Sequence, residues 1–158
     1  MGRNLLIERV VSEVLNEVLL SSTCTYLFCR DSNGKWNTLI GKRSSTAPAG
    51  ANQYTPPMGL LEKGENPLDG AVREIYEETE LKINKNLLKE YNKEQWGRGK
   101  VGINYYCILG GCIDDYVTGI GDGENERFIW IPIARYREYP FAFGTDNTML
   151  QIAKRVLR

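Results

Sequence analysis

Residues 59–81 read GLLEKGENPLDGAVREIYEETEL, and the pattern within this stretch indicates the fold. It predicts a helix over Asn66–Thr79, because Asn66 can cap the helix, Pro67 suits its first turn and Asp69 lies near its positive end. One face of this helix is expected to meet the core. That face is lined by Leu68, Ala71, Val72, Ile75 and Thr79.

Three glutamates follow helical spacing on another side of the same helix. Glu74, Glu77 and Glu78 stand at i, i+3 and i+4, where like charges repel by a few tenths of a kcal/mol per pair, to order of magnitude. Such a face is most often solvated surface. The other interpretation is a site for a hard divalent cation, because Mg²⁺ prefers oxygen ligands.

The spacing of the surrounding residues favours the cation site, because it resembles the Nudix box. That motif is Gly, five residues, Glu, seven residues, then Arg-Glu-aliphatic-x-Glu-Glu-x-Gly-aliphatic. One position departs from it, since Glu80 stands where the motif has its second glycine, which ends the helix in a left-handed conformation. We expect Glu80 to cost about 1 kcal/mol there, or the helix to run on. The matching positions are Gly59, Glu65, Arg73, Glu74, Ile75, Glu77, Glu78 and Leu81.

The resemblance implies an α/β fold, namely an α/β/α sandwich with a mixed sheet and a loop–helix–loop motif that holds Mg²⁺ or Mn²⁺. It implies Glu77 and Glu78 as the main metal ligands, joined by Glu74 and the Gly59 carbonyl. Arg73 is expected to hold a box glutamate by a charge-assisted hydrogen bond. The implied reaction is hydrolysis of a phosphoanhydride bond by metal-activated water. The implied substrate is a nucleoside diphosphate linked to another moiety, with nucleotide sugars, ADP-ribose, dinucleotides and NTPs all open.

Residues outside the box are candidates for the remaining roles. Relatives differ in which glutamate accepts the water's proton, and Glu126 is preferred here over Glu124 in the acidic loop before a late strand. Arg43 and Arg98 are candidate phosphate contacts, although a strand-end arginine is more often a surface residue. Base-stacking candidates include Tyr54, Trp96, Tyr105, Tyr106, Phe141 and Phe143, although most such aromatics belong to cores. Asn147 is a candidate base contact that competes with a role in capping the last helix.

Two further functions remain open beside the hydrolase. One is a catalytically inactive Nudix-fold protein that binds a nucleotide or regulates a partner, although such proteins usually lose box glutamates. The other is the isopentenyl-diphosphate isomerase branch, which normally needs metal-binding histidines. The chain contains no histidine, which also excludes Ser-His and Cys-His nucleophiles.

Composition sets the broad class. The 158 residues suit a single domain spanning 1–158, and the formal net charge of zero argues against nucleic acid or anionic membrane as a partner. The sequence has no apolar run long enough to cross a membrane and no secretory signal pattern, so a cytoplasmic location is expected. The four cysteines are interpreted as buried free thiols, with a zinc site as the weaker alternative.

Apolar periodicity predicts the other elements. Residues 1–20 form an amphipathic N-terminal segment with a helix over Leu5–Leu20, which would pack on the core or on a second subunit of a homodimer. A hairpin is expected around the turn Asp31–Gly34. Lys82–Lys100 resists assignment. The other predicted elements are strands at Thr23–Arg30, Trp36–Lys42, Val101–Ile113 and Phe128–Ile133, a loop at Ser44–Pro57, a turn at Gly119–Gly123 and a helix at Asn147–Leu157.

Overall fold

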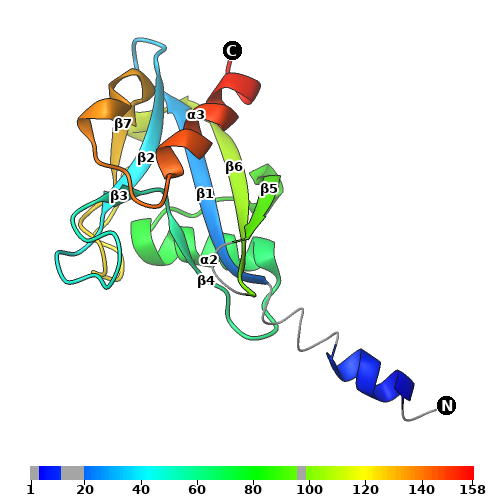
Figure 1. Cartoon of the computed structure of the whole chain (residues 1–158). Helices are drawn as coiled ribbons and strands as arrows, with labels where there is room; N and C mark the ends of the chain where they lie inside the picture. The colour runs from blue at the N-terminus through cyan, green and yellow to red at the C-terminus, as the bar shows by residue number, and fades with distance from the viewer. Residues whose placement is uncertain (1–3, 12–19, 96–98) are drawn as a thin grey trace.

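A mixed β-sheet forms the centre of the molecule (Figure 1). The computed structural model describes residues 4–11, 20–95 and 99–158. The sheet has the order β3-β2-β1-β6-β5, with β4 paired to β1 and β7 paired to β2. The strands are β1 (Leu20–Arg30), β2 (Trp36–Lys42), β3 (Tyr54–Thr55), β4 (Met58–Leu60), β5 (Lys89–Gln95), β6 (Val101–Cys112) and β7 (Ile129–Pro132).

The central pair of strands, β1 and β6, is parallel, whereas the other pairs of named strands are antiparallel. The predicted hairpin between β1 and β2 is confirmed, with Phe28 opposite Thr38. The Asp31 carboxylate closes its turn by accepting hydrogen bonds from the backbone N–H groups of Asn33 at 2.9 Å and Lys35 at 3.0 Å. An aspartate in this position favours a turn for that reason.

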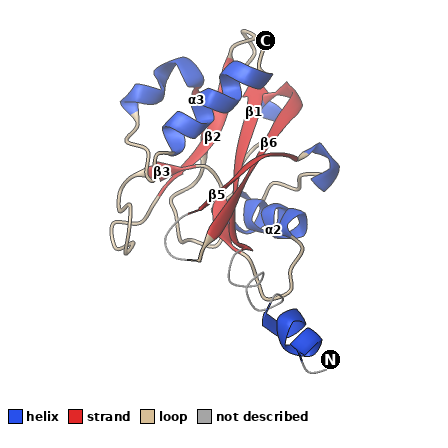
Figure 2. Cartoon of the chain, turned by 45° about the vertical axis from the view of Figure 1, so that its right-hand side comes forward, coloured by secondary structure: helices blue, strands red, loops and turns tan. Residues whose placement is uncertain are grey.

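Two helices cover opposite faces of the sheet, as Figure 2 shows. Helix α2 (Pro67–Thr79) packs Ala71 and Ile75 against one core, which includes Leu27. Helix α3 (Thr145–Val156) packs Met149 and Ile152 against the other, which includes Tyr26 and Phe28. Successive side chains of β1 therefore alternate between two cores, as a strand buried on both faces requires. The α/β/α sandwich with a mixed sheet is confirmed.

Several predicted boundaries need correction. Helix α3 begins at Thr145 rather than Asn147. Strand β6 ends at Cys112, and residues Ile113–Asp115 form the short 3₁₀ helix η2. Strand β7 is shorter than predicted, because Pro132 has no N–H for the ladder and a 3₁₀ helix, η3 (Ile133–Glu138), follows it. The unassigned segment Lys82–Lys100 contains the 3₁₀ helix η1 (Lys85–Leu87) and strand β5.

The N-terminal segment is helical over residues 4–11. The predicted helix is wrong at its far end, because Leu20 already belongs to β1, and residues 12–19 of that prediction lie outside the described residues. Helix 4–11 projects away from the sheet (Figure 1), so it does not pack on the core, and its contact with a second copy stays a prediction. Its exposed apolar side chains are Leu5, Leu6, Ile7, Val10 and Val11.

All four cysteines are free. Cys24, Cys29 and Cys107 are buried as predicted, whereas Cys112 is partly exposed at the end of β6. Burial raises the pKa of the Cys24 thiol to about 12 and that of Cys107 to about 11, so both remain protonated thiols near neutral pH. Within the described ranges, none of the helices has the length and apolar character needed to cross a membrane.

Candidate active site

Helix α2 carries the box glutamates and begins as the sequence predicts. Asn66 caps it by accepting a hydrogen bond from the Leu68 N–H at 3.0 Å, and Pro67 occupies the first turn. The helix ends at Thr79, and Glu80 adopts the left-handed conformation with φ 63° and ψ 11°. The substituted glutamate therefore accepts the backbone strain and stops the helix where a glycine would.

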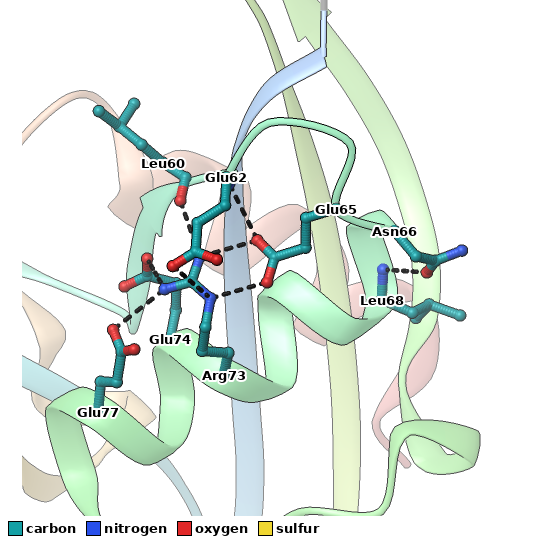
Figure 3. A network of polar contacts seen from close by, with 8 residues as sticks. All are labelled: Leu60, Glu62, Glu65, Asn66, Leu68, Arg73, Glu74 and Glu77. Atoms are coloured by element: carbon teal, nitrogen blue, oxygen red, sulfur yellow. Dashed lines mark hydrogen bonds and ion pairs between the residues drawn. The ribbon is translucent and has the colours of Figure 1, made fainter. Parts of the chain in front are cut away.

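Arg73 is the centre of a network of ion pairs on this helix (Figure 3). Its guanidinium makes two parallel hydrogen bonds to Glu65, from Nε to Oε2 at 2.8 Å and from Nη2 to Oε1 at 2.9 Å. Nη1 donates to Glu74 Oε1 at 2.9 Å and to Glu77 Oε2 at 3.0 Å, and Nη2 also donates to the Leu60 carbonyl at 3.0 Å. One side chain thus joins the box loop to two glutamates of the helix.

The charges in this network stabilise one another. Hydrogen bonds from Arg73 lower the pKa of the Glu65 carboxyl, and the carboxylates raise the pKa of Arg73 above its usual value. Glu65 also accepts the backbone N–H of Glu62 at 3.0 Å, so it fixes the loop that leads into the helix. A planar guanidinium matches this geometry, because its donors form a rigid fork that lysine lacks.

Gly59 and Glu74 are packed against each other. Strand β4 pairs with β1, and Gly59 stands opposite Thr23. A side chain at position 59 would run into the Glu74 carboxylate, so the glycine makes room for the acid. Burial raises the pKa of Glu74 above its ordinary value, although the hydrogen bond from Arg73 opposes this shift.

Glu78 is the most deeply placed acid of the box. Its exposed fraction is 5%, and desolvation raises its pKa to about 9, with further contributions from the charges of Glu74 and Asp122. The backbone N–H of Met58 donates to its carboxylate, and Asn125 Nδ2 lies 3.5 Å from Oε2. A buried carboxylate with so few donors is stabilised by a nearby positive charge. Glu77 differs, because its side chain is 44% exposed.

A cavity of about 480 Å³ opens beside Glu78. Its walls come from the segment after β2, from Met58, and from the acidic loop before β7. Its lining residues are Arg43, Ser44, Thr46, Ala47, Pro48, Met58, Glu78, Gly123, Glu124 and Asn125. The volume falls within the usual range for small-molecule sites, roughly 300–1,000 Å³.

Arg43 reaches this cavity from the end of β2. Its Nε donates to the Ala49 carbonyl at 3.0 Å, and its guanidinium carbon lies 5.1 Å from the centre of the Phe143 ring. Arg43 also forms an isolated bridge with Asn125, which ties the two walls together. The guanidinium is therefore held in place at the cavity edge.

Several other candidates, in the part of the chain that the structure describes, do not line the cavity. Glu126 lies in the same loop as Glu124, and its backbone N–H donates to the Lys42 carbonyl at 2.9 Å. Tyr54 packs edge-on against Tyr139, with ring centroids 5.2 Å apart. Asn147 is exposed in the first turn of α3. Arg98 and Trp96 lie outside the described residues, Tyr105 is buried in a core, and Tyr106 and Phe141 pack against the other core.

The structure adds two residues that the motif does not reveal. Asn125 lies beside Glu78, and the charge of Asp122 acts on the Glu78 carboxyl. Glu124 lines the cavity, and its charge acts on both Glu74 and Glu78. A turn signal at Gly119–Gly123 was present in the sequence, but the direction in which this loop folds depends on long-range packing.

The donors at this site suit a hard divalent cation. They are carboxylate and carbonyl oxygens, and the buried Glu78 charge calls for a positive partner. Within the described ranges no three Asp, Glu, His or Cys side chains converge as a ready-made cage. Mg²⁺ does not require one, because it is usually held by one or two carboxylates together with substrate phosphates and water. The residues therefore fit Mg²⁺ or Mn²⁺.

Comparison with known proteins identifies the family. A family model for the NUDIX domain matches residues 22–151, and the chain belongs to the Nudix family. No curated protein matches it significantly.

Solved structures with the same fold share little sequence with the chain. The NUDIX domain of Shewanella oneidensis NrtR, complexed with ADP ribose, superimposes with a TM-score of 0.72 at 19% identity, covering 87% of this chain and 88% of that one. A mutT/nudix family protein from Listeria innocua gives 0.65 at 20% identity, with 85% and 92% covered. A C. elegans Ap4A hydrolase gives 0.60 at 14% identity, with 87% and 97% covered. At these identities the likeness establishes the fold.

Proposed function

We propose that this chain is a Mg²⁺-dependent pyrophosphohydrolase that cleaves a phosphoanhydride bond in a nucleoside diphosphate linked to another moiety. The observation that carries the proposal is the buried Glu78 carboxylate, which faces a cavity of about 480 Å³ beside a helix organised by Arg73. A structural surface helix gains nothing from a buried acid of this kind. In a site for a cation bound to phosphate, by contrast, such an acid supplies a metal ligand.

In this proposal the box residues hold Mg²⁺ or Mn²⁺. Glu78 and Glu77 are the principal ligands, with Glu74 and the Gly59 carbonyl beside them. Arg73 fixes Glu74 and Glu77 through Nη1, so both carboxylates are oriented before any ligand arrives. When bound, the cation would neutralise phosphate oxygens and lower the pKa of a coordinated water.

Glu124 is the proton acceptor that the geometry favours over Glu126. Glu124 lines the cavity, and its charge acts on the carboxyl groups of Glu74 and Glu78. A general base must lie within hydrogen-bond reach of the water that it activates, directly or through one further water. The sequence-based preference for Glu126 stays an untested prediction, and the two glutamates can be separated by substitution.

Arg43 would bind the substrate from the opposite wall. Arg43 lines the cavity and its guanidinium is held by Ala49 and Phe143, so little side-chain freedom would be lost on binding a phosphate. A diphosphate placed between Arg43 and the box would leave the remaining cavity for the nucleoside or the linked group. Tyr54 and Asn147 stay candidates for contacts with that group, although neither lines the cavity. Arg98 stays a candidate as well, and it lies outside the described residues.

A hydrolysis screen tests this function. The purified chain would be incubated with Mg²⁺ and a panel of ADP-ribose, nucleotide sugars, dinucleoside polyphosphates, NADH and (d)NTPs, and the products identified by mass spectrometry. We expect one class to be cleaved between two phosphates, with no cleavage in EDTA. Lack of cleavage across the panel, combined with a rise in Tm caused by one nucleotide, would favour the binding or regulatory alternative.

A further inference from the structure

Glu80 occupies a position that would ordinarily demand glycine. Its φ of 63° lies in the left-handed region, which costs a residue with a Cβ roughly 1 kcal/mol relative to glycine. The Glu80 side chain extends from the end of α2 towards the turn at residues 119–121. The strain is therefore accompanied by a side-chain contact that glycine could not make.

That turn lies directly against the end of the helix. The Gly119 N–H donates to the Thr79 carbonyl at 2.9 Å, and the Gly121 N–H donates to Glu80 Oε2 at 3.3 Å. A Cβ at position 119 would meet the Glu80 carboxylate, and one at position 121 would meet the backbone carbonyls of Glu77 and Glu78. The two glycines allow the loop to approach this closely.

The chain that leaves this turn enters the candidate active site. Asp122 follows directly, and its charge acts on the Glu78 carboxyl. Gly123, Glu124 and Asn125 then line the cavity, where Asn125 lies beside Glu78. Gly121 is thus the last anchored backbone group before the residues that face the box.

We propose that Glu80 is a positioning residue that holds the loop 121–125 against the box through its hydrogen bond to the Gly121 N–H. Glycine at this position could end the helix but could not contact the loop, whereas the Glu80 carboxylate links the end of α2 to the loop directly. The role in cation binding rests on the proposed function, whereas the anchoring itself does not.

Three substitutions at position 80 separate the acceptor from the backbone strain. Glu80→Gln keeps an acceptor oxygen, Glu80→Ala keeps the strain without the acceptor, and Glu80→Gly removes both. Hydrogen exchange of the loop amides would be followed by mass spectrometry on the full chain without metal or substrate. We expect exchange of the peptide containing Gly121 to quicken about fivefold in Glu80→Ala and Glu80→Gly, and to stay near the parental rate in Glu80→Gln.

Cation affinity gives a second readout that does not depend on turnover. Titration with Mn²⁺ alone, followed by the EPR signal of the free ion, should show about tenfold weaker binding in Glu80→Ala and near-parental binding in Glu80→Gln. Glu80→Gly should weaken Mn²⁺ binding as much as Glu80→Ala does. Its Tm should be at least as high as that of Glu80→Ala, because glycine relieves the backbone strain. A uniform loss of Tm and affinity across all three variants would instead indicate a merely structural residue and overturn the proposal.

Gly119→Ala tests the same contact from the loop. Its backbone does not require glycine, and the added methyl group would displace the Glu80 carboxylate. We expect this variant to match Glu80→Ala in exchange and affinity, with no further effect when the two are combined.

Parental exchange in both single variants, Glu80→Ala and Gly119→Ala, would overturn the anchoring. Faster exchange of the Gly121 peptide in these variants, combined with parental Mn²⁺ affinity, would overturn the positioning role. A parent that binds no Mn²⁺ would overturn the proposed function and the positioning role, and leave the anchoring to the exchange data.

Discussion

The Glu74 carboxylate fills the space that a side chain at position 59 would occupy, so Gly59 and Glu74 act as a packed pair. We predict that Gly59→Ala displaces this carboxylate and weakens Mn²⁺ binding by about tenfold or more, because the ligand geometry changes while the charge is kept. Isothermal titration with Mn²⁺ measures the loss. Gly110→Ala is the matched control, since a methyl group there meets open space. Equal affinity in both variants would contradict the pairing.

Glu78 and Glu77 should respond differently to loss of charge. Glu78→Gln and Glu77→Gln are each predicted to lower kcat by at least about 10³, because both remove a proposed metal ligand. Glu78→Gln should also raise the Tm in EDTA at neutral to alkaline pH, since a neutral amide of similar shape folds without the cost of protonating or burying the Glu78 carboxylate. Glu77→Gln should leave the Tm nearly unchanged, because that side chain is 44% exposed. Near-normal turnover in both variants would contradict the metal assignment.

Stability without metal should decrease as the pH rises. Burial raises the pKa of Glu78 to about 9 in the folded state, whereas the unfolded chain titrates near the ordinary value of 4.5. Between those values the folded state binds a proton that the unfolded state has released, so the free energy of unfolding falls with increasing pH. Burial raises the pKa of Glu74 as well, so this group contributes to the same pH dependence.

Mg²⁺ should counteract this pH dependence, because the cation takes the place of the proton. We predict that the rise in Tm produced by Mg²⁺ grows between about pH 6 and about pH 9. Differential scanning fluorimetry in EDTA and in Mg²⁺ measures it. Glu78→Gln should lose most of the slope, and a parent protein whose metal-free Tm increases over this range would contradict the assignment.

Arg73 should not be replaceable by lysine. Arg73→Lys keeps the charge but loses the paired hydrogen bonds to Glu65, so we predict a decrease of about 2 kcal/mol in the free energy of unfolding. Urea denaturation in EDTA measures it. Arg135→Lys is the control, because the Arg135–Glu138 pair is exposed and screened by solvent, so this variant should keep nearly the parental free energy of unfolding. Similar losses in the two variants would show that the network has no special stability.

The two loop glutamates can be ranked directly. Glu124→Gln is predicted to lower kcat about 10² to 10⁴-fold through loss of the general base, whereas Glu126→Gln should change it less than about threefold. Initial rates on the substrate found in the screen decide between them. The opposite order would support the preference for Glu126 drawn from the sequence.

The box helix was predictable because its signals are local. Asn66 caps it, Pro67 opens it, and Ala71 and Ile75 face the core as their spacing indicates. The hairpin after β1 was predictable for the same reason, since Asp31 closes its own turn. Such features depend on neighbours a few residues away, which the sequence displays directly.

Features that depend on contacts between residues far apart in the sequence could not be predicted from such local signals. Strand β5 carries mostly charged and polar side chains, and its conformation comes from backbone pairing with β6 at the sheet edge. The choice of Glu124 over Glu126 at the cavity depends on how Gly119 and Gly121 seat the loop on helix α2. The sequence does not decide the helix boundary at Glu80, because the partner of its side chain lies 41 residues further along the chain.

The Arg73 network bears on the order in which ligands bind. Arg73 contributes one positive charge against the carboxylates of Glu65, Glu74 and Glu77. This excess of negative charge repels a diphosphate that arrives alone. A nucleotide is therefore expected to enter only after the divalent ion or together with it, and the metal–nucleotide complex would be the kinetically competent substrate. Free nucleotide in excess over the metal should then slow the reaction by sequestering the ion.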